Sequence, residues 1–147
     1  MRITICGSIA FIDEMQATKN ELEGLGHEVK VPPSEIVDEN GKVMSAKKYY
    51  ALRKATNTTD GWVWDRKEQA MRNHFEKVVW ADSILVLNHD KDNILNYIGA
   101  NTLLEMELAF HHRKKIFLFK PIPEISYKEE ILGMRPVVIS EDLSLIV

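Results

Sequence analysis

The stretch RITICGSIAF, residues 2–11, decides the fold of this chain. Residues 2–6, RITIC, form a short run with β-branched side chains at its centre, which predicts a buried strand, and Gly7 and Ser8 end that strand with a turn. A helix is expected next, from Phe11 to Leu25, because its buried positions recur at three- and four-residue spacing. The sequence therefore begins with a strand, a turn and a helix.

The same pattern continues along the chain. Asn40 and Gly41 give a turn signal inside the segment 34–63, which we interpret as a lid. Further strands are expected at 27–31, 83–88, 115–119 and 136–140, and further helices at 46–56, 65–80, 102–114 and 127–132.

Five short apolar strands that alternate with helices predict a parallel sheet covered on both faces. We expect an α/β, three-layer flavodoxin-like fold with a five-stranded parallel sheet of order 2-1-3-4-5, as a single domain over residues 1–147. In such folds ligands bind at the carboxyl ends of the strands, at the switch point between strands 1 and 3. The residues that follow those two strands are therefore the first candidates for a binding site.

Composition excludes several classes of partner. The net charge of -3 does not favour a nucleic-acid polymer, and no apolar stretch is long enough to span a membrane. The N-terminal apolar run is broken at Gly7, so we expect no signal peptide. We therefore expect a cytoplasmic protein. The single cysteine, Cys6, lies in an apolar run and is expected to be a buried, inert thiol.

We expect neither a metal nor a cofactor. His89, Asp90 and Asp92 have side chains that can bind metals, but no cysteine pair or HExxH motif accompanies them. The turn CGSIAF is neither a GxGxxG motif nor a P-loop, so a dinucleotide or a triphosphate is not expected.

The turn at Gly7 and Ser8 suits a smaller ligand. Glycine permits close approach of the backbone, and the Ser8 hydroxyl with the free N–H groups of the next helix suits a monophosphate or a hydroxyl-rich sugar. The alternative is that Gly7 only makes a tight turn and Ser8 only caps a helix.

Glu105 and Glu107 lie in the apolar helix TLLEMELAF, residues 102–110. Residues two apart lie about 200° round a helix, so one carboxylate faces inward and the other outward. Glu105 lies near the amino end and can reach the predicted crevice, where a carboxylate can act as nucleophile or base. The alternative is that both are solvated helix residues.

Together, the segments CGSIAF, ADSILVLN and GANTLLEMELAFHHRKKIFLF resemble the nucleoside 2-deoxyribosyltransferase family, which includes deoxynucleoside 5′-monophosphate N-glycosidases. The resemblance covers most of the chain. It implies N-glycosyl transfer or hydrolysis on a (deoxy)nucleoside or its 5′-monophosphate. It also implies a homodimer or a higher homo-oligomer.

The resemblance assigns roles to particular residues. Glu105, with the small residue Ala109 four positions on, matches the family's nucleophile, and His74 or an acid of the 88–92 loop would protonate the leaving base. The substrate-binding residues implied are Gly7, Ser8, Ile9, Phe11, Asn88 and Tyr97.

Two departures leave alternatives open. His74 stands where the monophosphate glycosidases carry an aspartate, and Glu107 stands where a glycine is usual. A non-catalytic nucleotide-binding or sensing module with the same fold is therefore a second hypothesis. An unrelated flavodoxin-like FMN binder is a third, but CGSIAF is not the Ser/Thr-rich loop that such a protein needs.

Overall fold

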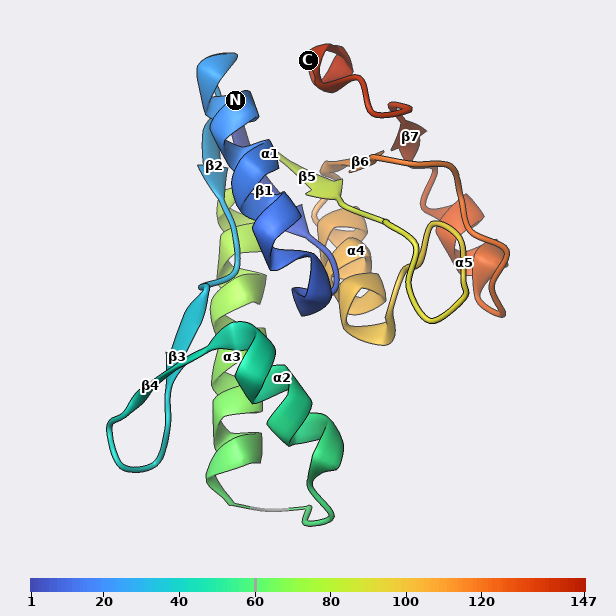
Figure 1. Ribbon diagram of the computed structural model, residues 1–147. Helices are drawn as coiled ribbons and strands as arrows, with labels where there is room; N and C mark the ends of the chain where they lie inside the picture. Colours follow the sequence, from blue (N-terminus) through green and yellow to red (C-terminus); the bar gives the residue numbers. More distant parts are fainter. Residues whose placement is uncertain (60) are drawn as a thin grey trace.

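The computed structural model describes residues 1–59 and 61–147 and has a parallel five-stranded sheet at its centre (Figure 1). The order of the strands is β2-β1-β5-β6-β7, which is the predicted order 2-1-3-4-5. The α/β fold class is therefore confirmed. The strands are β1 (Arg2–Cys6), β2 (Glu28–Lys30), β5 (Ser83–Val86), β6 (Lys115–Leu118) and β7 (Val137–Val138).

Helices cover both faces of the sheet. Helix α1 (Ile12–Gly24) packs on one face, and the helices α3 (Trp62–Trp80), α4 (Ala100–His111) and α5 (Lys128–Gly133) pack on the other (Figure 1). The short 3-10 helix η1 (Ile9–Phe11) leads from β1 into α1, and η2 (Leu143–Leu145) lies near the carboxyl terminus.

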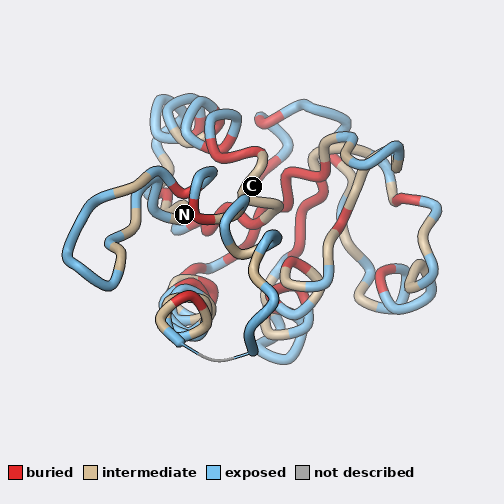
Figure 2. Tube along the Cα trace, turned by 60° about the horizontal axis from the view of Figure 1, so that its bottom comes forward, coloured by how far each residue is buried: buried red, intermediate tan, exposed pale blue. Residues whose placement is uncertain are grey.

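The side chains of β1 alternate between the two faces, as the period of a strand requires. Ile3 and Ile5 pack in the core beneath α1, whereas Cys6 packs in the core beneath α3 and α4. Buried residues gather along the strands and on the inner sides of the helices (Figure 2). This alternation places the Cys6 thiol on the face that carries Glu105.

The segment expected to be a lid contains a hairpin that the sequence did not predict. Strands β3 (Glu35–Val37) and β4 (Val43–Ser45) form a separate two-stranded antiparallel sheet. The Ser45 hydroxyl then accepts a hydrogen bond from Lys48 N and caps helix α2 (Ala46–Ala55). The hairpin and α2 lie beyond the carboxyl end of β1 (Figure 1), where α2 contacts η1.

In the described part of the chain, no helix is both long enough and apolar enough to cross a membrane.

Candidate active site

A cleft of about 1130 Å³ opens beside the turn that follows β1. Gly7 and Ser8 line it from that turn, α2 contributes Tyr49 and Tyr50, and α3 and α4 contribute most of the remaining wall. The volume is at the upper end of what small-molecule sites occupy in proteins. The cleft lies where the topology predicted a ligand site.

Glu105 points into this cleft from α4 and is only 3% exposed. Asn101, one helical turn earlier, donates from Nδ2 to Glu105 Oε1 at 2.9 Å. The second carboxyl oxygen, Oε2, is buried and has no hydrogen-bond partner among the described residues. Burial raises the pKa of Glu105 to about 8, against the smaller opposing effects of the Cys6 thiol and Lys67. The first of the two glutamates therefore faces inward, while Glu107 is exposed.

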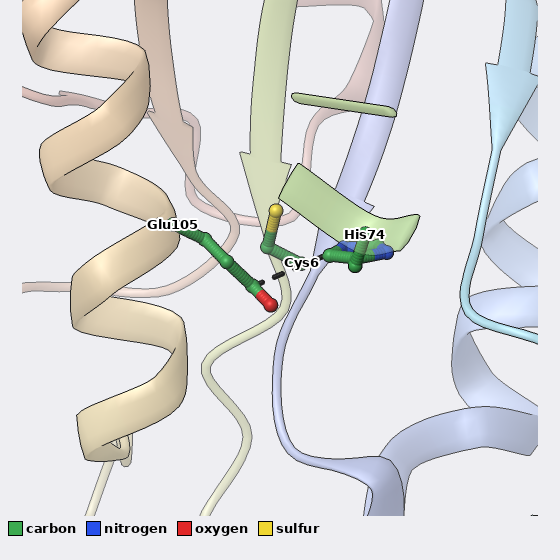
Figure 3. A group of neighbouring side chains, drawn as sticks. All are labelled: Cys6, His74 and Glu105. Carbon is green, nitrogen blue, oxygen red and sulfur yellow. Dashed lines mark ion pairs between the residues drawn. The ribbon is translucent and has the colours of Figure 1, made fainter. Parts of the chain in front are cut away.

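His74 contacts the same carboxyl oxygen from α3. Its Nε2 lies 3.8 Å from Glu105 Oε2, and the residue is 6% exposed (Figure 3). Burial, with a smaller contribution from Lys77, lowers the pKa of His74 to about 4, so the imidazole is neutral near pH 7. A neutral imidazole 3.8 Å from the carboxyl is not a charged acid ready to protonate a leaving group.

Lys67 orients the glutamate through Asn101. Lys67 Nζ donates to Asn101 Oδ1 at 3.3 Å, and the Asn101 amide donates to Glu105. The bond from Lys67 fixes which end of the Asn101 amide faces the glutamate, because an ammonium can only donate. Partial burial lowers the pKa of Lys67 to about 8.

A second polar cluster lies at the turn after β1. Lys91 Nζ donates to Ser8 Oγ at 2.9 Å and to Tyr50 Oη at 2.8 Å. The same ammonium lies 4.9 Å from the ring centre of Tyr50 and 5.1 Å from that of Tyr97. An ammonium and a hydroxyl side by side are the groups that bind phosphate oxygens.

The cleft is strongly basic for a chain whose net charge is -3. Among its described lining residues, six are basic and only two, Glu76 and Glu105, are acidic. A cleft lined by one sign of charge concentrates ligands of the opposite sign. The basic residues are Lys30, Arg53, Lys54, Lys67, Lys77 and Lys91.

The structure brings most of the predicted site residues together. Six of the eight line the cleft, and two do not. Phe11 is buried in the core beneath α1, and Asn88 uses its side-chain amide to bind the backbone of Lys120 and Pro121. Those that line the cleft are Gly7, Ser8, Ile9, His74, Tyr97 and Glu105.

The loop after β5 supplies a lysine rather than an acid. The ring of His89 packs between those of Phe11 and Phe119, at centroid distances of 5.2 and 5.5 Å. Asp90 Oδ1 accepts a hydrogen bond from Asn96 N at 2.9 Å. In the described part of the loop, Lys91 lines the cleft, but His89, Asp90 and Asp92 do not.

Sequence reasoning missed Asn101, Lys67 and Lys91. Asn101 carried a usable signal, because it precedes Glu105 by four residues and therefore lies on the same helix face. Lys91 carried none, since it reaches the cleft through a tight turn in which Asp92 and Asn93 adopt φ of 52° and 62°.

With this geometry, the chain can be compared with known proteins. It matches the 2-deoxyribosyltransferase of the psychrotolerant bacterium Bacillus psychrosaccharolyticus with a TM-score of 0.51, at 17% sequence identity, over 85% of this chain and 76% of that one. The fold resembles that of a 2-deoxyribosyltransferase. A second solved structure, the CMP N-glycosidase BcmB of Clostridium botulinum, matches over 94% of this chain and 85% of that one, at 16% identity and a TM-score of 0.46.

No protein-family model matches the sequence, and the comparison with curated proteins gives no match. The resemblance to the nucleoside 2-deoxyribosyltransferase family is thus confirmed at the level of the fold. Because folds host many chemistries, function has to be argued from the cleft itself.

Proposed function

We propose that this protein cleaves or transfers the N-glycosidic bond of a nucleoside 5′-phosphate, with Glu105 as the nucleophile. The observation that carries the proposal is the Glu105 carboxyl group: it is almost fully buried at a basic cleft, one oxygen is held by Asn101, and the other has no well-formed hydrogen bond among the described residues, with the Cys6 thiol beside the carboxyl. A buried polar oxygen without a well-formed hydrogen bond is costly, and such groups concentrate at functional sites. The similarity in fold to a 2-deoxyribosyltransferase supports the same chemistry.

In this proposal Glu105 Oε2 attacks the anomeric carbon of the sugar. A new C–O bond forms as the C1′–N bond breaks, and the nitrogenous base leaves with the bonding electrons and takes up a proton from solvent. The Glu105 proton leaves to solvent before the attack, because His74, whose pKa is about 4, is too weak a base to take it from a carboxyl whose pKa is about 8. Water or a second base then attacks the same carbon and releases the Glu105 carboxylate.

The phosphate is assigned to the cluster of Ser8, Lys91 and Tyr50. The Ser8 hydroxyl and the Lys91 ammonium lie together, 2.9 Å apart, and would turn from each other to the phosphate oxygens. The excess of basic side chains in the cleft supports a phosphorylated substrate over an uncharged nucleoside. The aromatic rings of Tyr50 and Tyr97 flank the same lysine.

The direct test is a substrate panel. Purified protein is incubated with ribo- and deoxyribonucleosides and with their 5′-monophosphates, each with and without a free acceptor base, and base release is followed by chromatography. We expect base release from a 5′-monophosphate, faster than from its nucleoside, and none with the Glu105→Gln variant. A new nucleotide that forms only when the acceptor is present would identify a transferase.

The same panel separates the second candidate. If a nucleotide raises the melting temperature of wild type and of Glu105→Gln equally, yet no base is released from any substrate, the protein is a nucleotide-binding or sensing module. Base release by Glu105→Gln at the wild-type rate would also reject Glu105 as the nucleophile.

A further inference from the structure

Three side chains with metal-binding atoms meet beside the cleft, which two of them, His74 and Glu105, line. Cys6 comes from the end of β1, His74 from α3 and Glu105 from α4 (Figure 3). One ligand atom from each lies within 4.8 Å of the other two, and all three residues are buried. We propose that Cys6, His74 and Glu105 form a binding site for a zinc ion.

The polar atoms of this cluster lack well-formed hydrogen bonds. Among the described residues, both ring nitrogens of His74 and Glu105 Oε2 are buried without a well-formed hydrogen bond, although the Cys6 thiol interacts with the carboxyl and the Ile5 backbone with the imidazole. Most buried polar side-chain atoms in folded proteins have a partner, so three atoms without a well-formed hydrogen bond in one cluster require an explanation. A cation bound between them satisfies the Glu105 oxygen and the facing His74 nitrogen together.

The types of ligand select zinc. A thiolate and an imidazole are soft or borderline ligands, which bind zinc in preference to magnesium or calcium. Zinc bonds of about 2.0–2.3 Å in a tetrahedron place neighbouring ligand atoms roughly 3.3–3.6 Å apart. His74 Nε2 and Glu105 Oε2 are 3.8 Å apart and need only a small movement, whereas separations within the trio reach up to 4.8 Å and would have to shorten by about 1 Å.

The surroundings fit a zinc site with one open position. Asn101 already holds Glu105 Oε1, which leaves Oε2 free for the metal and fixes the orientation of the carboxylate. His74 and Glu105 line the cleft, so an ion can enter from that side and keep a water molecule as its fourth ligand.

Zinc binding is balanced in charge and in protons. The ion replaces the thiol proton of Cys6 and the carboxyl proton of Glu105, so two protons leave as one divalent cation binds. The imidazole of His74 binds as a neutral ligand. No oxidant or reductant takes part.

Zinc at this site occupies Glu105 Oε2, the oxygen that we assign to attack on the sugar. The ion would therefore inhibit turnover and compete with the substrate for the carboxylate. This consequence rests on the proposed function, whereas the binding of zinc does not.

Cobalt(II) is the spectroscopic probe for the test, because it replaces zinc and absorbs visible light. Chelator-treated protein is titrated with Co²⁺ alone. Cys6 is the only cysteine of the chain, so any thiolate-to-cobalt charge-transfer band must come from it. We expect that band, together with strong tetrahedral d–d absorption, and we expect one equivalent of Zn²⁺ to remove both.

Two variants test the ligand assignment. Cys6→Ser should abolish the charge-transfer band and weaken zinc binding by roughly tenfold or more. The exposed residues His111 and His112, whose rings are 5.4 Å apart, are neighbouring imidazoles outside the cluster, so a His111→Asn/His112→Asn double variant is the matched control and should keep the band.

Weak octahedral absorption without a charge-transfer band in the wild-type protein would overturn the zinc site, whether or not Cys6→Ser folds. If the charge-transfer band is present but zinc has no effect on base release, the zinc site is retained and Glu105 is rejected as the nucleophile. If zinc blocks base release in the wild-type protein but leaves it unchanged in Cys6→Ser, the result supports both the zinc site and the assignment of Glu105 as the nucleophile.

Discussion

Replacing Glu105 by glutamine should make the protein more stable while it removes activity. The wild-type carboxyl group is 3% exposed, and burial raises its pKa from 4.5 to about 8. In the unfolded chain the same group ionises above pH 4.5. Folding at neutral pH therefore requires it to take up a proton, a cost that glutamine does not have.

The size of this cost follows from the two pKa values. Each pH unit above the unfolded pKa of 4.5 costs about 1.36 kcal/mol for as long as the folded carboxyl remains protonated. At pH 7 the cost is about 3 kcal/mol, it reaches its maximum above the folded pKa of about 8, and it is absent below pH 4.5. Glutamine also keeps the hydrogen bond from Asn101, because its oxygen can replace Oε1.

The assay is urea unfolding of metal-free wild type and Glu105→Gln at pH 4, pH 5.5 and pH 7. We expect the free energy of unfolding to be equal at pH 4 and to favour the variant by about 1 kcal/mol at pH 5.5 and about 3 kcal/mol at pH 7. Glu107→Gln, on the exposed side of the same helix, is the control and should change stability by less than about 0.5 kcal/mol at every pH. A Glu105→Gln variant that is less stable at pH 7, or whose advantage does not vary with pH, would refute the reasoning.

Three further predictions concern the rest of the cleft. Lys91→Met should weaken binding of a 5′-monophosphate by roughly 10- to 100-fold, because a charge-assisted hydrogen bond is lost, and leave nucleoside binding unchanged, as isothermal titration would measure. Affinity for the phosphate should fall as pH rises through about 8, where Lys67 loses its charge. Lys67→Met should weaken that pH dependence, leaving the part due to Glu105, which ionises over the same range, and should raise the melting temperature at pH 7, because the partly buried ammonium is absent. Gly7→Ala should lower the free energy of unfolding by about 1–3 kcal/mol, because the added Cβ would lie 2.9 Å from Met15 Cε and 3.0 Å from Leu87 O.

Each of these predictions has a matched control. Lys42 is exposed and outside the cleft lining, so Lys42→Met should leave nucleotide binding unchanged. Equal losses of affinity for nucleoside and nucleotide in Lys91→Met would contradict its assignment to the phosphate. Gly24 has no atom within 4 Å of an added Cβ, so Gly24→Ala should not destabilise the protein. A Gly7→Ala variant as stable as wild type would show that the turn has room for a side chain.

The sequence predicted the fold because hydrophobic periodicity is a local property. The strand over 2–6 and the helix over 46–56 were found within a residue of their bounds, since burial on one or both faces decides which positions are apolar. The β3–β4 hairpin was missed, because its strands are three residues long and largely exposed.

The cleft was harder to predict, because its contacts join residues far apart in the chain. Helical spacing predicted that one of Glu105 and Glu107 faces inward, but nothing local indicated that Cys6 would lie beside it. Lys91 reaches Ser8, 83 residues earlier, only because the loop turns sharply after β5. Such long-range contacts depend on the sheet order and on the conformation of backbone turns, which the residue types alone do not determine.

The most direct test of the central claim is to trap the glycosyl-enzyme. Metal-free protein is incubated with 2′-fluoro-substituted nucleoside 5′-monophosphates, in which the fluorine slows the second step, and its intact mass is measured before peptide mapping. We predict an added mass equal to one sugar phosphate, located on the peptide that contains Glu105 and missing from Glu105→Gln. Base release from the unsubstituted nucleotides without any adduct, or an adduct on another residue, would contradict the account.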